Sequence, residues 1–378
     1  MEYMVCKELD FGILKFCMRR MFMSESMNVV MKEKAEKGAV FTTKERPEPK
    51  NNEVLVKIHA TSICGTDAHI YSWDQWSQSR IKPPYVMGHE FAGEVVKIGK
   101  DVKSIQLGDI VSAETHIVCE VCEFCKTGQA HICKDTKILG VDVDGTYAEY
   151  VAIPEANAWV NPKGIDPAYL AVQEPLGNAV HTIMEGDIVG KSIAVVGCGP
   201  IGIMAVAVAK AVGASKVIAV EVNEYRLNLA KELGADVVIN PINDDPIQRI
   251  LDETDGLGVD IVAEMSGNAR AIDQALKYLK LGGRMSMLGI PNDKISLDVA
   301  NDIVFKGITI QGIAGRKMYK TWYQVKGLIE SGNLNLEPII THRLPMKDFQ
   351  KGFELMESGN CGKVVLYPDP SILEKHQK

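Results

Sequence analysis

Four cysteines lie close together in one short stretch of the chain. Cys119, Cys122, Cys125 and Cys133 follow the spacing C-x2-C-x2-C-x7-C. Four thiolates in one loop suit closed tetrahedral coordination of Zn(II), which leaves no position for a substrate. An iron–sulfur cluster is the competing interpretation, but the last gap is longer than in the bacterial ferredoxin pattern, and a lysine rather than a proline follows Cys133. The spacing therefore predicts a structural zinc site.

A second set of metal-binding side chains is spread over three segments. Cys64 lies in the sequence SICGTD, His89 and Glu90 in GHE, and Glu174 in QEPLGN. One thiolate, one imidazole and one or two carboxylates suit a catalytic zinc that keeps a position open. By spacing alone this signal is weak, because a lone cysteine is usually part of the core and a lone glutamate is usually solvated.

A glycine-rich turn predicts a nucleotide site. Gly197, Gly199 and Gly202 form G-x-G-x-x-G between the apolar run Ser192 to Val196 and the helically spaced run Ile201 to Val212. The first glycine makes the tight turn, the second lets the backbone approach a pyrophosphate, and the third packs helix on strand. The helix N-terminus then faces the phosphate charge.

Glu221 indicates which dinucleotide binds there. It ends the second predicted strand, nineteen residues after Gly202, where a carboxylate accepts hydrogen bonds from the adenosine ribose. A 2'-phosphate beside it would bring like charges together at a cost of about 1 to 4 kcal/mol, so NAD is favoured over NADP. Arg226 could accept such a phosphate, or could be a helix-surface charge.

The elements that position these residues differ between the two halves of the chain. The first half, to about residue 150, predicts short strands at Val54 to Ala60, Glu90 to Ile98, Asp109 to Ser112 and Tyr147 to Ile153. After Pro175 strands and helices alternate, with strands at Ser192 to Val196, Lys216 to Val222, Asp260 to Glu264, Arg284 to Leu288 and Ile308 to Ile313, and a helix at Ala269 to Leu279.

These patterns predict an α/β protein with a mostly β domain and a doubly wound, six-stranded parallel sheet of the Rossmann type. From about Tyr319 the sequence predicts two helices, Thr321 to Ser331 and Lys347 to Ser358, and a last strand, Lys363 to Tyr367, that returns to the first domain.

Composition narrows the class of protein. The chain has 378 residues, 46% of them hydrophobic, and a net charge of -7, which disfavours nucleic acid as a partner and favours small molecules. The sequence contains no run of eighteen apolar residues, so it predicts no membrane-spanning segment. Nine cysteines, an odd number, indicate a reducing cytoplasm rather than a disulfide framework. Residues 1–26 do not read as a secretory signal, and we interpret them as a disordered extension or a misassigned start.

Taken together and in this order, the CGTD, GHE, four-cysteine and G-x-G-x-x-G motifs resemble the zinc-dependent medium-chain alcohol dehydrogenase superfamily, over nearly all of residues 27–378. Within it, the chain resembles the L-threonine 3-dehydrogenase family. The segments that carry this closer resemblance are Ala60 to Trp76, Thr115 to Cys119, Glu174 to Val180 and Ile339 to Arg343.

The resemblance implies a domain division and roles for individual residues. It implies a GroES-like zinc-binding catalytic domain at 27–176 and 319–378, and a Rossmann NAD-binding domain at 177–318. Cys64, His89 and Glu90 match zinc ligands, and Glu174 matches an acidic residue that ligates the metal or helps relay a proton. Further matches are Thr66 and His69 to the proton relay, His116 to substrate recognition, and Ile201, Glu221, Arg226, Leu288, Gly289, Ile290, Ile313 and Ala314 to positions that line NAD.

The resemblance further implies the activity, which is oxidation of L-threonine to L-2-amino-3-oxobutanoate by a cytoplasmic homotetramer with NAD and with one catalytic and one structural zinc per subunit. One rival is a polyol or 2,3-butanediol dehydrogenase of the same superfamily. A second is a zinc-free module used for quinone reduction or for binding. The sequence leaves open which groups bind the ammonium and carboxylate of the substrate, and whether Glu90 or Glu174 ligates the metal directly.

Overall fold

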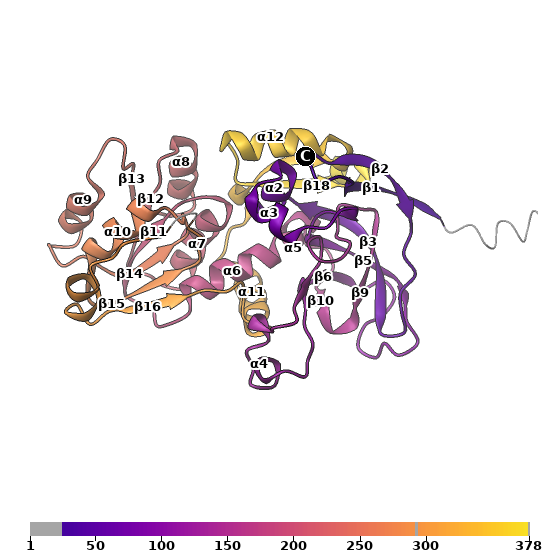
Figure 1. The fold of residues 1–378 in the computed structure, drawn as a ribbon, viewed down its shortest axis with the longest axis horizontal. Coiled ribbons are helices and arrows are strands. Elements are labelled where there is room, and N and C mark those ends of the chain that lie inside the picture. The colour runs from indigo at the N-terminus through magenta and orange to yellow at the C-terminus, as the bar shows by residue number, and fades with distance from the viewer. Residues whose placement is uncertain (1–24, 292–293, 377–378) are drawn as a thin grey trace, which may run out of the picture.

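The computed structural model describes residues 25–291 and 294–376. The expectation for residues 1–26 therefore lies almost entirely outside the described residues. Figure 1 shows two lobes side by side, one built around mostly antiparallel strands and one around a parallel sheet flanked by helices. The predicted fold class is confirmed.

The first lobe is a seven-stranded sheet with smaller sheets beside it. Its strand order is β10-β6-β5-β3-β18-β17, and β9 also pairs with β3. The strands of this sheet are β3 (Glu53–Ser62), β5 (Glu90–Ile98), β6 (Ile110–Ala113), β9 (Tyr150–Pro154), β10 (Ala158–Asn161), β17 (Ile340–Pro345) and β18 (Lys363–Tyr367). The smaller sheets contain β1 (Ser26–Lys32), β2 (Val40–Glu45) and β4 (Tyr85–Val86), and β7 (His116–Ile117) with β8 (Lys137–Ile138).

The second lobe is a six-stranded parallel sheet in the order β13-β12-β11-β14-β15-β16. This is the order of a doubly wound dinucleotide-binding sheet. The chain starts at the central strand β11, adds strands toward one edge, and then returns to the centre and adds strands toward the other edge. The strands are β11 (Ser192–Val196), β12 (Lys216–Val220), β13 (Val237–Ile239), β14 (Val259–Glu264), β15 (Leu279–Met287) and β16 (Thr309–Gly312).

Alternate side chains of β11 show why this sheet needs helices on both faces. Ile193 and Val195 pack into one buried cluster with the helix α7 (Pro200–Ala211), whereas Ala194 and Val196 pack into another with α10 (Ala269–Tyr278). A central parallel strand is apolar throughout for this reason. The other α-helices described in this lobe are α8 (Glu224–Glu232) and α9 (Pro246–Asp252), and a short π-helix, η3 (Val299–Val304), lies between β15 and β16.

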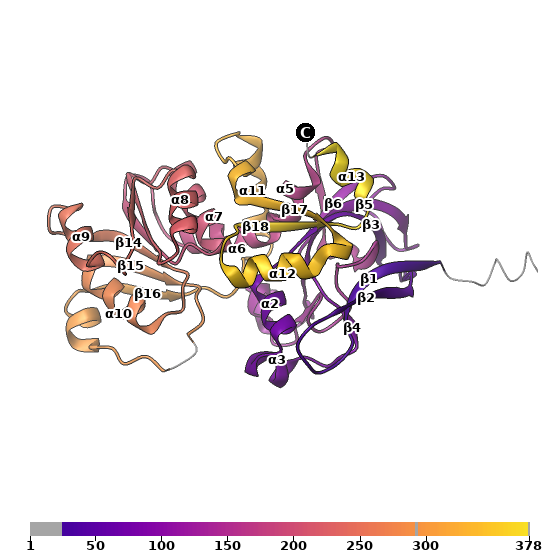
Figure 2. The ribbon, with the colours of Figure 1, turned by 90° about the horizontal axis from the view of Figure 1, so that it is seen from above.

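The chain crosses between the lobes twice, at α6 (Gln173–Ile183) and at the segment between β16 and α11 (Lys320–Glu330). α6 and α11 pack against each other, and both lie where the lobes meet (Figures 1 and 2). After α11 the chain adds β17, α12 (Phe349–Ser358) and β18 to the first lobe, where β18 pairs with β3. The remaining α-helices of the described residues are α2 (Gly65–Ser72), α3 (Gln75–Arg80), α4 (Glu123–Lys126), α5 (Pro167–Ala171) and α13 (Pro370–Lys375).

Within the described part of the chain, none of the helices combines the length and the apolar character needed to cross a membrane.

Candidate active site

Cys64, His89 and Glu90 meet in the first lobe, with one ligand atom from each residue within 4.8 Å of the others. The ends of β3 and β5 bring them together, because Cys64 follows β3 and Glu90 begins β5. Glu90 is fully buried, and its Oε1 has no hydrogen-bond partner among the described residues. A buried carboxylate oxygen without a partner is costly unless a cation binds it, so this donor set fits a divalent metal.

Asp67 supports this group, in a role that the sequence alone did not predict. Its Oδ2 accepts hydrogen bonds from the Cys64 N–H at 3.0 Å and the Tyr147 hydroxyl at 2.8 Å. Its Oδ1 lies 3.7 Å from His89 Nδ1. Neither of these two atoms has a hydrogen-bond partner among the described residues. Asp67 thus stands where a carboxylate can accept the second ring N–H of a metal-ligating histidine and orient the ring. Its place as the last residue of the CGTD motif was the feature of the sequence that could have indicated this role.

Lys363 provides a buried positive charge at the same centre. It comes from β18 and is only 1% exposed. Its Nζ donates to the Ile63 carbonyl at 2.7 Å and to Glu90 Oε2, which also accepts from the Ser62 hydroxyl. Burial raises the pKa of Glu90, and Lys363 opposes this effect. The ion pair therefore holds one carboxylate oxygen and leaves the other for a metal.

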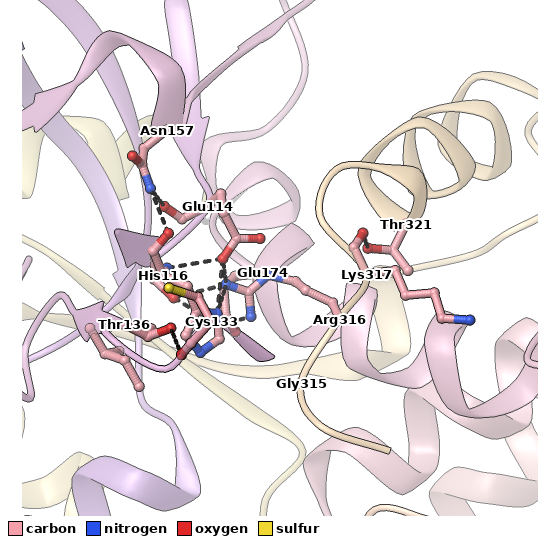
Figure 3. Close-up of polar contacts among 12 residues, drawn as sticks. Glu114, His116, Cys133, Thr136, Asn157, Glu174, Gly315, Arg316, Lys317 and Thr321 are labelled. Atoms are coloured by element: carbon pink, nitrogen blue, oxygen red, sulfur yellow. Dashed lines mark hydrogen bonds and ion pairs between the residues drawn. The ribbon is translucent and has the colours of Figure 1, made fainter. Parts of the chain in front are cut away.

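Glu174 lies beside this group but outside it. Its Oε1 accepts hydrogen bonds from Arg316 Nη1 and from the Thr115 hydroxyl, the latter at 3.2 Å. Figure 3 shows Glu174 together with Arg316. Glu174 is near enough to His89 and Glu90 for its charge to act on both. The structure therefore turns Glu174 toward an arginine rather than toward the three candidate ligands.

His116 belongs to the same polar network. Its Nδ1 lies 3.0 Å from Glu114 Oε1 and 3.3 Å from Arg316 Nη2. Because the carboxylate is the closer group and can only accept, we assign the proton to Nδ1, which leaves Nε2 as an acceptor. Burial would raise the pKa of Glu114, but the charge of Arg316 lowers it to about 2.

Thr66 and His69 lie on α2, three residues apart and thus on one face of the helix. The Thr66 side chain is half-buried, whereas His69 is 61% exposed and its Nδ1 lies 2.6 Å from Asp74 Oδ2. Asp74 also caps α3 by accepting from Ser77 N at 2.9 Å, so its position is fixed. The helix therefore places an inner hydroxyl and an outer imidazole near Cys64, which precedes α2.

The four clustered cysteines form a separate group away from the first. Their sulfurs lie 3.6 Å apart for Cys122 and Cys125, 3.8 Å for Cys122 and Cys133, and 3.5 Å for Cys119 and Cys133. A tetrahedron with a Zn–S bond of about 2.3 Å has sulfurs about 3.8 Å apart. The cluster therefore fits a closed four-thiolate zinc site.

The glycine-rich turn has the backbone that a pyrophosphate site needs. Gly197 has φ of 87°, and a Cβ there would lie 2.8 Å from Ser266. A Cβ at Gly202 would lie 2.0 Å from the Gly197 carbonyl oxygen. A Cβ at Gly199, in contrast, would meet no protein atom within 4 Å. Gly199 precedes α7 and has no side chain to cap the helix, so the first N–H groups of α7 lack a side-chain cap and suit an anion.

A cavity of about 320 Å³ lies next to this turn, lined among others by Gly197, Glu221, Ser266 and Asn268. Glu221 immediately follows β12 rather than ending it, because this strand stops at Val220. Its carboxylate accepts from the N–H groups of Cys198 and Val222, each at 2.8 Å, and of Asn223 at 3.0 Å.

The other cofactor residues proposed from sequence do not line this cavity. They lie at the starts of helices or just after strands at the carboxyl edge of the sheet, where dinucleotides bind in such folds. Ile201 is in the first turn of α7, Arg226 in the first turn of α8, Leu288 to Ile290 follow β15, and Ile313 with Ala314 follow β16.

Residues 50–163 match the family described as alcohol dehydrogenase GroES-like domain, and residues 200–331 match the zinc-binding dehydrogenase family. An L-threonine 3-dehydrogenase from Caldanaerobacter subterraneus subsp. tengcongensis is 57% identical, over 90% of this chain and 99% of that protein.

Two solved structures with lower identity share the fold. A 2R,3R-butanediol dehydrogenase from Bacillus subtilis has a TM-score of 0.83 and 27% identity, covering 91% of this chain and all of that one. A protein described as a short chain alcohol dehydrogenase from E. coli CFT073, complexed with NADH, has a TM-score of 0.82 and 27% identity, covering 90% and 99%. The chain thus belongs to the L-threonine 3-dehydrogenase family of zinc-dependent medium-chain dehydrogenases.

Proposed function

We propose that this protein oxidises L-threonine to L-2-amino-3-oxobutanoate with NAD as the hydride acceptor. The observation that carries the proposal is the group of half-buried Cys64 with buried His89 and Glu90. Glu90 Oε1 has no partner among the described residues, and the chain is 57% identical to an L-threonine 3-dehydrogenase. The reaction removes a hydride from the β-carbon and a proton from the β-hydroxyl, giving the ketone, NADH and one proton.

Cys64, His89 and Glu90 would hold the catalytic zinc, with Asp67 orienting His89 and Lys363 fixing Glu90. A zinc ion held there favours loss of the substrate hydroxyl proton by lowering its pKa. The structural zinc would be held by Cys119, Cys122, Cys125 and Cys133.

The chain's own groups would move the proton and place the substrate. The Thr66 hydroxyl would pass the proton outward, and His69 would release it to solvent through Nε2, since Asp74 holds its Nδ1. His116 would contact the substrate through Nε2, with Glu114 holding its Nδ1.

The Rossmann lobe would place the nicotinamide against the substrate. The open space before Gly199 and the α7 N-terminus would hold the pyrophosphate, and Glu221 would hold the adenosine ribose and disfavour a 2'-phosphate. We also propose that the protein acts as a cytoplasmic homotetramer, with the domain boundaries expected from sequence. Light scattering of the purified protein tests the tetramer.

Initial rates of NADH formation test the substrate assignment. L-threonine, D-threonine, 2,3-butanediol and sorbitol are compared on zinc-replete protein, first with NAD and then with NADP. The proposal expects L-threonine with NAD to be preferred by at least about a hundredfold, since a site that leaves polar groups unpaired can reject an analogue by about ten-thousandfold or more. Turnover of only the diol or the polyol would overturn the threonine assignment and retain the hydride chemistry.

A further inference from the structure

Arg316 is a fully buried arginine between two carboxylates that come from distant parts of the chain. It lies in the segment that leaves the Rossmann lobe after β16, and it is 1% exposed. Its Nη1 donates to Glu174, and its Nη2 donates to Glu114 and, at 2.9 Å, to the Thr115 hydroxyl. Figure 3 shows the side chain reaching across from this segment into the network.

The Glu114 end of this bridge is fixed by other contacts. Glu114 Oε2 accepts from Trp322 Nε1 at 2.9 Å, and Oε1 accepts from the His116 N–H at 2.9 Å. Glu114 is fully buried. The guanidinium is therefore anchored on one side, and Glu174 is the partner that could move.

α6 has a gap that admits the arginine. A Cβ on Gly177 would lie 2.9 Å from Arg316 Cδ. Glycine in the middle of a helix is otherwise unfavourable relative to alanine. Glu174 and Gly177 are three residues apart on one face of α6, so the same face supplies both the carboxylate and the space through which Arg316 reaches it.

We propose that Arg316 is a positioning residue that holds Glu174 away from the catalytic metal and so keeps one coordination position of that metal open to the substrate. Three ligands and an open position distinguish a catalytic zinc from a structural one, and Glu174 is the nearby group that could close the site. The inference rests on the metal centre of the proposed function.

Cobalt substitution provides a test that does not depend on activity. Co²⁺ replaces zinc in the whole enzyme, and the difference spectrum between wild type and Cys64→Ser isolates the catalytic centre from the four-cysteine site. The visible absorption of Co²⁺ weakens as its coordination number rises above four. In Arg316→Lys, which keeps the charge but cannot bridge both carboxylates, this absorption is expected to weaken. Loss of Co²⁺ to a chelator is expected to slow by about tenfold, the scale on which residues that support metal ligands act.

Gly177→Ala is a second variant for the case in which Arg316→Lys does not fold. It displaces the arginine without changing any charge, and the same spectral change is expected. Adding Glu174→Gln to either variant should restore the wild-type absorption, which loss of packing alone would not explain. Lys317→Met, at the neighbouring residue that pairs with Glu185, is the matched control and should leave the spectrum unchanged.

The outcomes separate the inference from the function on which it rests. If Cys64→Ser removes no cobalt signal, the metal centre itself is wrong and the inference falls with it. If that signal is present but Arg316→Lys and Gly177→Ala leave it unchanged, the inference alone is wrong. Faster loss of Co²⁺ in these variants would also overturn it, because Arg316 would then support ligation instead of opposing it.

Discussion

Replacing Lys363 with methionine should destabilise the metal-free protein much more than the metal-loaded protein. Lys363 is 1% exposed and pairs with the fully buried Glu90. Methionine fills similar space but leaves the Glu90 carboxylate without its countercharge. Removing one partner of a buried ion pair costs about 3 to 5 kcal/mol. With the metal bound, a divalent charge beside Glu90 takes over part of this role, so we expect a loss of about half that size.

Urea titrations of wild type and Lys363→Met, each with zinc and after chelation, measure the effect. The difference of differences cancels the contribution of the four-cysteine site, which is the same in both proteins. The matched control is Lys210→Met, because Lys210 makes a surface pair with Asp236 at 2.9 Å, and such a pair contributes less than about 1 kcal/mol. An equal loss with and without metal would refute the argument that Glu90 faces both Lys363 and the metal.

Three further predictions concern the other sites. Cys64→Ser should abolish NADH formation with little change in melting temperature, whereas Cys122→Ser should mainly lower the melting temperature. Equal effects of the two substitutions in both assays would contradict the division into two metal sites. Gly199→Ala should fold like wild type and raise the KM for NAD by at least about tenfold. Gly202→Ala should also lower the thermal stability, because only the Cβ at residue 202 would meet protein atoms. Thermal unfolding and NAD titration of both variants measure these effects. The charge of Arg316 lowers the pKa of Glu114 to about 2 in the folded protein, below its ordinary value. The Glu114 carboxylate therefore contributes its full stabilisation above about pH 4.5 and loses it as the pH falls toward 2. An acid-unfolding curve should show this loss in wild type but not in Glu114→Gln.

Local patterns were sufficient to predict much of the fold. The alternation of apolar runs and helical spacing predicted five of the six strands of the parallel sheet, and Glu90–Ile98 and Ser192–Val196 have the predicted bounds. The missed strand, β13 (Val237–Ile239), is only three residues long, too short for a periodic signal. β9 begins at Tyr150, three residues after the predicted start. The backbone N–H groups of Thr146 and Tyr147 instead donate hydrogen bonds to the carbonyls of Gly88 and Met87, which follow β4.

The two candidate metal-binding groups could be named from sequence because their residue types are rare and their motifs are short. Cys64, His89 and Glu90 lie together, as the resemblance implied, and so do the four clustered cysteines. The charges that support them were not predictable. Lys363 and Arg316 read as ordinary surface charges in the sequence, since charged residues are seldom buried unless paired. Their partners lie 142 to 273 residues away, so only the fold reveals the pairing.

Isotope labelling tests directly whether this protein moves a hydride from the β-carbon of L-threonine to NAD. L-threonine deuterated at that carbon is incubated with zinc-replete enzyme and NAD, and mass spectrometry follows both products. We expect one deuterium in the NADH, none in the 2-amino-3-oxobutanoate at that carbon, and no reaction in Cys64→Ser. NADH without deuterium, or the same labelled NADH formed by Cys64→Ser, would contradict it.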